Sequence, residues 1–191
     1  MAISNKLVTP PFRASYVHLI EPKPPAAGAE PVFSMAVVLP KDNPETKKFM
    51  KNLKALQDQV AKDKFGKLPK TLKRGVKDGD NLDSEKEHPE WEGCYVFTVK
   101  SKTQPGIIGS DLQPIMEEDK LYSGAEYRVS LSMWAWSHAT GGKGISYNLD
   151  NVMWVKDGDR FDNRSAATDD FADYASEAVE EEDGEEEVDF D

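Results

Sequence analysis

A stretch of alternating residues from Ala125 to Trp136 carries the side chains best suited to binding chemistry. Successive side chains of a strand point to opposite faces, so Arg128, Trp134 and Trp136 would share one face. The other face would hold Tyr127, Val129, Leu131, Met133 and Ala135. Exposed aromatic rings stack on nucleobases, and neighbouring cations bind phosphate. The pattern predicts a stacking platform, with the alternative that one or both tryptophans pack beneath another element.

Residues elsewhere in the chain could extend this platform. Tyr147 and Trp154 lie on the next predicted strand, and Lys143 lies in the glycine-rich turn before it. Lys100 and Lys102 stand at the end of an earlier strand. We expect the aromatic rings to stack on bases. The phosphate-binding residues would then be Arg128, Lys100, Lys102 and Lys143.

The patterns that would indicate an enzyme are weak. The turn Gly141–Gly144 contains a lysine but lacks the glycine spacing and the following Ser or Thr of a P-loop. The acidic residues Asp111 and Glu117–Asp119 could form a magnesium site, although such clusters in loops are usually solvated. A single cysteine, Cys94, excludes intrachain disulfides and thiolate zinc sites, and its strand context predicts burial. We therefore expect no catalytic residues, cofactor or metal.

Strands and turns account for most of the chain around these residues. Phe12–Ile20 and Val32–Leu39 read as strands separated by a proline-rich hairpin loop. Further strands are predicted at 94–100, 125–136 and 145–155. One helix interrupts this series. The expected fold is mainly β, a small barrel of five to six strands with an inserted α-helix.

The inserted helix has recognisable ends and one apolar face. Asn43 is a suitable N-cap, Pro44 suits the first turn, and Gly66 is placed to end the helix. The apolar positions are spaced by four, three and four residues, at Phe49, Leu53, Leu56 and Val60. From Lys41 to Lys77 the chain has 12 basic and 4 acidic residues. This segment is either a solvated surface or a phosphate-facing patch, and Lys62–Lys77 is a second candidate groove wall.

The charge is divided unevenly along the chain. The net charge is −11, yet residues 165–191 hold 13 Asp or Glu and no Lys or Arg. The rest therefore has 22 acidic and 24 basic residues, a balance of +2. We expect a folded domain at 1–164 and a disordered acidic tail at 165–191. The tail is either a solubilising extension or a mimic of nucleic acid that binds a cationic groove or partner proteins, and its ending Asp189, Phe190, Asp191 favours the second.

The location of the protein follows from missing targeting patterns. The sequence has no run of 18 apolar residues and no apolar core of a signal peptide after Met1. We expect the protein in the cytoplasm or nucleoid of its cell.

The ordered set of motifs resembles phage single-stranded DNA-binding proteins of the OB-fold type, over nearly the whole chain. Its carriers are the strand before Pro40 and the helix after it, Pro105–Ile108, Tyr122–Ala125, Trp134–Trp136, Lys143–Val152, Asp157–Phe161 and the acidic tail. The resemblance implies sequence-independent binding of single strands in phage replication, recombination or repair, by a monomer or homodimer. It also implies that the tail contacts phage or host replication proteins. In several such proteins the tail ends on the aromatic residue, whereas here Asp191 follows Phe190.

A second interpretation stays open at this point. The protein would be a replication or recombination accessory whose main ligand is another protein.

Overall fold

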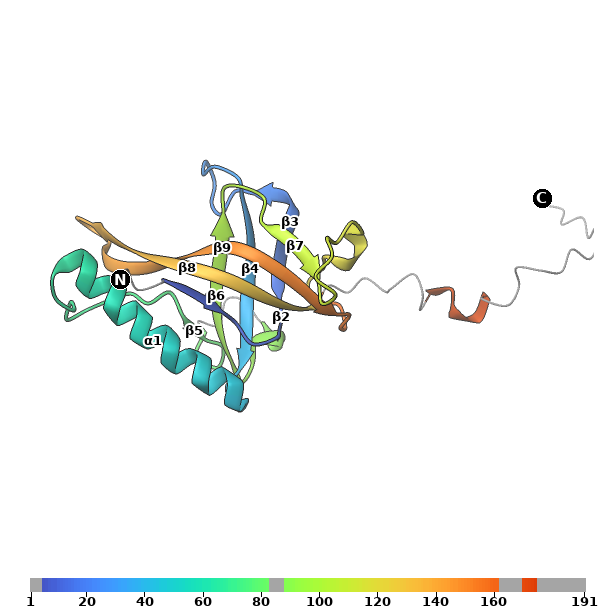
Figure 1. Cartoon of the computed structure of the whole chain (residues 1–191), viewed down its shortest axis with the longest axis horizontal. Helices are drawn as coiled ribbons and strands as arrows, with labels where there is room; N and C mark the ends of the chain where they lie inside the picture. The colour runs from blue at the N-terminus through green and yellow to red at the C-terminus, as the bar shows by residue number, and fades with distance from the viewer. Residues whose placement is uncertain (1–4, 83–87, 162–169, 175–191) are drawn as a thin grey trace, which may run out of the picture. The chain divides into compact units, whose positions relative to one another are not determined.

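A computed structural model describes residues 5–82, 88–161 and 170–174. Its contacts divide the chain between Phe161 and Asp162. In the first unit one helix, α1 (Pro44–Phe65), accompanies a nine-stranded sheet (Figure 1). The strands are β1 (Lys6–Val8), β2 (Phe12–Arg13), β3 (Ser15–Lys23), β4 (Val32–Pro40), β5 (Lys77–Asp78), β6 (Cys94–Ser101), β7 (Gly106–Gly109), β8 (Glu126–His138) and β9 (Gly142–Lys156). Short 3₁₀ helices lie at Pro89–Trp91, Glu118–Lys120 and Ala172–Tyr174.

The sheet has the strand order β1-β8-β9-β6-β4-β3 and is open. The short strand β2 pairs with β8, whereas β3 pairs with β4 at the other end of the path. Because Ala14 alone separates β2 from β3, one chain segment contacts both ends of the curved sheet. This confirms the prediction of a mainly β, OB-like fold with one inserted helix. The short strands beyond the predicted five or six have two to four residues, too few for alternation to show.

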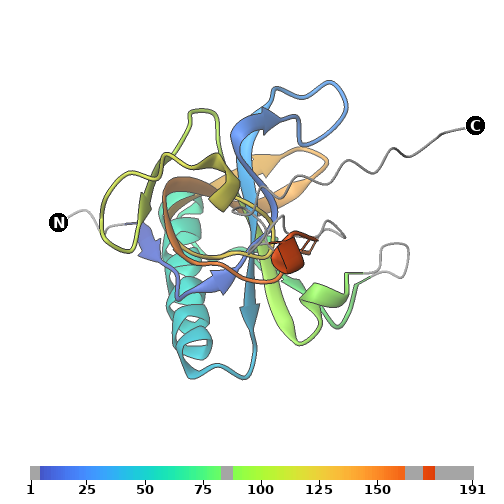
Figure 2. The same ribbon diagram turned by 90° about the vertical axis from the view of Figure 1, so that its right-hand side faces the viewer.

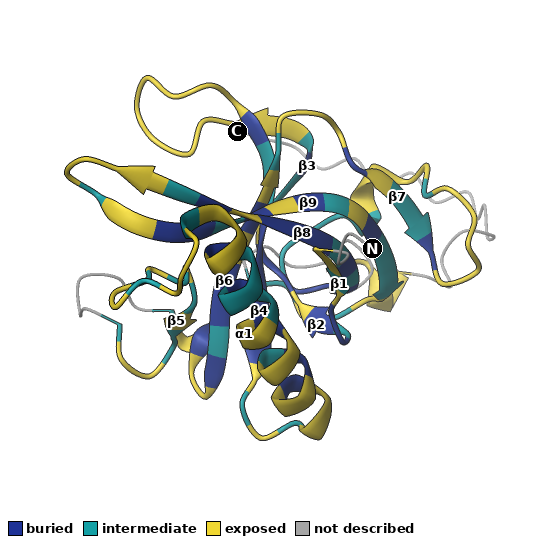
Figure 3. Ribbon diagram, turned by 60° about the vertical axis from the view of Figure 1, so that its left-hand side comes forward, coloured by how far each residue is buried: buried dark blue, intermediate teal, exposed yellow. Residues whose placement is uncertain are grey.

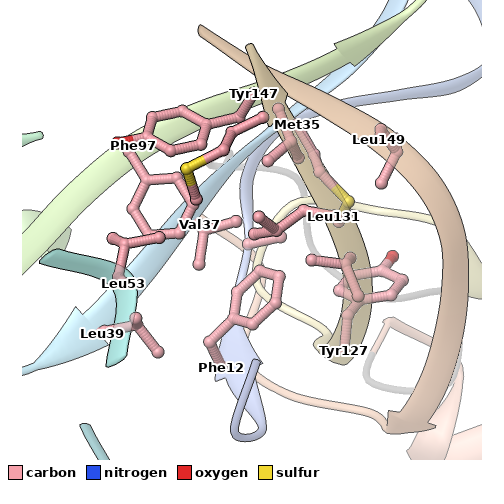
Figure 4. Close-up of a cluster of buried hydrophobic side chains, with 14 of the residues drawn as sticks. Phe12, Met35, Val37, Leu39, Leu53, Phe97, Tyr127, Leu131, Tyr147 and Leu149 are labelled. Atoms are coloured by element: carbon pink, nitrogen blue, oxygen red, sulfur yellow. The ribbon is translucent and has the colours of Figure 1, made fainter. Parts of the chain in front are cut away.

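The strand β8 supplies one wall of the core. The side chains predicted to face inward are all buried, namely Tyr127, Val129, Leu131, Met133 and Ala135. They meet side chains from β2, β4, β6, β9 and α1 (Figure 4). Full burial of one such side chain contributes about 1.5–3 kcal/mol. The alternation read from the sequence is confirmed along this strand.

The helix α1 begins and ends where the sequence predicts. The Asn43 side chain accepts a hydrogen bond from the Glu45 N–H at 2.8 Å. At the other end Gly66 has a φ of 77° and its N–H donates to the Lys62 carbonyl at 2.8 Å. The helix runs beside the strands and contacts β8 and β9 (Figure 2). Its Phe49 ring stacks on Phe97 of β6, with the ring centroids 6.3 Å apart.

A second, smaller cluster packs on the outer surface of β4 and β6. It contains Ala36, Val38, Trp91, Cys94 and Val96. The Trp91 indole N–H donates to the Ser15 hydroxyl of β3 at 3.0 Å, so the ring lies across three strands. Cys94 is buried, as predicted.

Candidate nucleic-acid interface

The outer face of the β8–β9 hairpin holds the predicted platform. Trp134 pairs with Ser146 across the hairpin, and Trp136 pairs with Gly144. Directly paired residues share a face of the sheet, so these four lie on the surface opposite the core. The Trp134 side chain is 48% exposed. The far end of the hairpin is also exposed (Figure 3).

Trp136 is half-buried, and glycine is what makes room for its ring. A Cβ on Gly144 would overlap the indole carbons of Trp136 and come within 3.0 Å of the Lys73 carbonyl oxygen. The other neighbour of the ring is His138, with the centroids 5.1 Å apart and the planes inclined by 39°. The Trp136 ring is therefore held in place by its neighbours, whereas the Trp134 ring is the more exposed of the two.

The lysine-rich segment after α1 runs beside this hairpin. The Lys73 N–H donates to the Lys143 carbonyl at 2.9 Å, and the Ile145 N–H donates to the Lys73 carbonyl at 2.8 Å. The Lys143 ammonium lies 4.5 Å from the centroid of the Phe65 ring at the end of α1. Part of the predicted second groove wall thus borders the platform. Its contact with nucleic acid stays a prediction.

The two lysines at the end of β6 differ in their surroundings. Lys100 is exposed and stands between Ser34 of β4 and Asn148 of β9. Asn148 in turn pairs with Ser132, two residues before Trp134. The ammonium of Lys102 lies 3.2 Å from the Glu30 carboxylate, and both side chains are highly exposed. Lys100 therefore lies on the same face of the sheet as Trp134. Lys102 forms a weak surface ion pair beyond the end of β6.

A cavity of about 190 Å³ opens beside Lys100. It lies over β6, between β9 and the segment that leads into β5. Its buried lining residues are aliphatic or aromatic, and its exposed ones are Gly75, Lys77, Thr98 and Lys100. The lining residues are Gly75, Lys77, Trp91, Val96, Phe97, Thr98, Lys100, Ile145, Ser146 and Tyr147. The sequence did not indicate that Lys77 and Trp91 line one cavity, because Trp91 stands in a polar, acidic loop. The signal that could have pointed to Trp91 is the presence of a single tryptophan in such a loop.

Tyr147 is not part of the exposed platform, which corrects the prediction that it stacks on bases. Its side chain is only 3% exposed, because it pairs with the inward-facing Met133. The phenol donates to the Arg74 carbonyl and accepts from the Gln57 amide at 2.5 Å. Burial raises the pKa of Tyr147 to about 12. Tyr147 is a core residue that joins β9 to α1 and the following loop.

Arg128 stays on the outward face of β8, and its contact with phosphate stays a prediction, whereas Trp154 turns towards the core and does not join Trp134. The Arg128 guanidinium is half-buried and donates to the Thr9 carbonyl at 3.2 Å. Trp154 is half-buried against the core, and the Lys120 ammonium lies 5.1 Å from its ring centroid.

A bulge in β9 explains the position of Trp154. Ser130 pairs with Asn151 and Leu131 with Leu149, so Asp150 is the extra residue. One extra residue reverses which side chains face inward beyond that point. The inward positions are Tyr147 and Leu149 before the bulge and Val152 after it. Trp154 follows the second set.

The partner-binding prediction for Asp189, Phe190 and Asp191 lies outside the described residues. The described part of the acidic segment is short. It forms the 3₁₀ helix Ala172–Tyr174, with Phe171 and Tyr174 exposed.

Two further kinds of site are absent from the described part of the chain. Within residues 5–82, 88–161 and 170–174, no group of three His, Cys, Asp or Glu residues could hold a metal ion. None of the helices described there is long and apolar enough to cross a membrane.

With this geometry in place, comparison with known proteins identifies the family. Residues 5–185 match the family model described as Enterobacter phage Enc34, ssDNA-binding protein. The chain belongs to this family.

Solved structures agree with this assignment. The single-stranded DNA-binding protein from bacteriophage Enc34, solved in complex with ssDNA, is 25% identical with a TM-score of 0.70, over 83% of this chain and 90% of that one. The single-stranded DNA-binding protein gp2.5 of bacteriophage T7 shares the fold, with a TM-score of 0.59 at 14% identity over 95% of this chain and 98% of that one.

A curated relative is the putative protein p50 of Acyrthosiphon pisum secondary endosymbiont phage 1. It is 29% identical over 108 residues, or 56% of this chain. The match spans about half the length of that relative, 55%.

Proposed function

We propose that this protein binds single-stranded DNA without sequence preference and acts in phage DNA replication, recombination or repair. The observation that carries the proposal is the exposed Trp134 ring, on the same face of the hairpin as Trp136, with Lys100 exposed on β6 and Lys143 near the turn of the hairpin. Membership of a family described as ssDNA-binding, and the likeness to a protein solved with ssDNA, support it.

The chemistry of this face suits unpaired bases. A stacked base contributes about 1–3 kcal/mol, whatever its identity, because every base has a π-face. Lysine ammonium groups bind phosphate as point charges and add a salt-dependent part that is also independent of sequence. Duplex DNA should bind more weakly, because its bases are already stacked. We assign stacking to Trp134 and Trp136 and phosphate binding to Lys100 and Lys143.

The acidic segment at 165–191 has a separate proposed role. The segment has 13 carboxylates and no Lys or Arg. These carboxylates would compete with DNA phosphates for the basic face. DNA binding would then release the segment for phage or host replication proteins, which Asp189, Phe190 and Asp191 would contact. This role depends on charge and sequence alone.

The test is binding of a labelled oligo-dT measured by fluorescence anisotropy. Trp134→Ala should weaken the affinity at least about five-fold, as expected from the loss of one stacked base. The matched control is Leu112→Ala, which removes an exposed apolar side chain from a loop after β7. Unchanged affinity in Trp134→Ala, with normal binding by the wild type, would contradict the stacking role.

The same titration decides between this function and a protein-binding accessory. The exposed Met116, in the loop that also holds Leu112, is the apolar side chain that favours the second function. Absence of single-strand binding by the wild-type protein would support the accessory function.

A further inference from the structure

We propose that the cavity walled by Trp91 seats one nucleobase of a bound single strand, and that Tyr16 is a second stacking residue beside it. This inference rests on the proposed function. It adds a base-binding subsite over β6, next to the Trp134 platform.

The backbone of Tyr16 is in an unusual conformation for an aromatic residue. Its φ is 51°, in the left-handed region that favours glycine. The pairing of β3 with β4 is irregular at this point, with a shift in register between Ser15 and His18. Such an irregularity re-aims a side chain out of the regular alternation. The result is a tyrosine ring that is 51% exposed at a position within a strand.

Aromatic neighbours, not the main core, hold the Tyr16 ring. Its centroid lies 6.1 Å from Trp91 in an edge-to-face arrangement and 5.7 Å from His88. His88 stacks on Trp91 with the centroids 3.9 Å apart. Trp91 is itself fixed by its hydrogen bond to Ser15, the residue before Tyr16. The rings of Trp91 and His88 therefore support the Tyr16 ring, and part of Tyr16 stays open to a ligand.

The cavity has the size and lining of a subsite for one base. Its volume of about 190 Å³ exceeds several times the roughly 30 Å³ that a water occupies, and it is smaller than the pockets of about 300 Å³ or more that hold drug-sized ligands. Trp91 offers an apolar wall, and the hydroxyls of Thr98 and Ser146 can bond to base edges. Lys77 and Lys100 place two cations at the rim for the adjoining phosphates. Among the described lining residues there is no Asp or Glu.

The register of the sheet connects this subsite to the platform. Ser15 pairs with Ala36, and Ala36 pairs with Thr98, which lines the cavity. On the other side the cavity is bounded by Ser146, the partner of Trp134. A single strand lying across β9, β6 and β4 would therefore pass from Trp134 over the cavity to Tyr16.

The first test compares Tyr16→Ala with Leu112→Ala in oligo-dT binding. Leu112 is a suitable control, because it is exposed and also has a left-handed φ of 63°. Tyr16→Ala should weaken binding at least about five-fold, Tyr16→Phe should bind like the wild type, and Leu112→Ala should be unchanged. If Tyr16→Ala unfolds, Lys77→Gln tests the same subsite, because it should lower the slope of log affinity against log salt by about 0.7.

A second measurement separates base stacking from a loss of phosphate contacts. With an oligonucleotide made entirely of abasic residues, Tyr16→Ala and the wild type should bind equally weakly. Suppose that the wild type binds oligo-dT and that Tyr16→Ala and Lys77→Gln have the same affinity and the same salt slope as the wild type. The proposed subsite is then wrong, and the proposed function stands. If the wild type itself does not bind oligo-dT, the proposed function fails with it.

Discussion

The indole of Trp136 on β8 lies against the backbone of Gly144, its direct partner on β9, in space that a Cβ would otherwise fill. The same glycine lies next to the Lys73 carbonyl of the segment after α1. This contact joins the three elements that border the platform: β8, β9 and the lysine-rich segment. The glycine-rich turn therefore shapes the platform as well as reversing the chain.

Gly144→Ala should displace the Trp136 ring, because the new methyl group overlaps it. Overpacking of this kind costs about 1–3 kcal/mol, so the melting temperature should fall and oligo-dT affinity should weaken. Thermal melting and anisotropy measure the two effects. Adding Trp136→Ala should recover most of the melting temperature lost in Gly144→Ala, because the overlap then disappears. If the loss of melting temperature in the double variant equals the sum of the losses in the two single variants, the contact between Trp136 and Gly144 is contradicted.

Tyr147→Phe should lower stability without lowering oligo-dT affinity. The change removes the bonds to the Arg74 carbonyl and the Gln57 amide and leaves only the longer bond of 3.5 Å between those two groups, at a cost of about 0.5–1.5 kcal/mol for each lost bond. Urea unfolding and anisotropy measure the two quantities. A loss of affinity at unchanged stability would mean that Tyr147 reaches the DNA after all.

The stabilisation by Tyr147 should depend on pH in the alkaline range. Its pKa is raised by burial from 10.0 to about 12, so the neutral phenol is favoured in the folded protein. The stabilisation is therefore complete below pH 10 and is lost as the pH rises towards about 12. Burial also raises the pKa of Tyr127 and Tyr122, so the wild type must be compared with Tyr147→Phe. The stability difference between the two should shrink over this range; a constant difference would exclude the effect.

Salt dependence should rank the lysines. For single strands, log affinity falls with log salt by about 0.7 for each neutralised phosphate. Lys143→Ala and Lys100→Ala should each reduce this slope by about that amount. Lys102→Ala should change it less, because its ammonium already lies beside Glu30. Equal slopes for the three variants would show that position relative to the platform is irrelevant.

Deletion of residues 165–191 should tighten single-strand binding, because it removes 13 carboxylates and no cation. The gain should be largest at low salt, where screening is weakest. The truncated protein should also fail to capture replication proteins in a pull-down. Equal affinity of the two forms at low ionic strength would rule out competition for the basic face. Phe190→Ala then tests partner binding separately.

Local signals in the sequence were enough to predict several elements correctly. The caps at Asn43 and Gly66 bounded α1, because capping depends on a few adjacent backbone groups. The regular alternation of β8 identified its inward face and placed Trp134 and Trp136 on the outer one. The motif order was also enough to indicate the family.

Features that depend on pairing between distant segments became visible only in the folded protein. The extra residue Asp150 reverses the faces of β9, so Tyr147 and Trp154 both turn towards the core, which no alternation read from one strand could reveal. Trp91 and Tyr16 meet although a long stretch of sequence separates them, because β3, β4 and β6 pair side by side. Register and bulges are set by contacts between strands, and a single sequence records them only weakly.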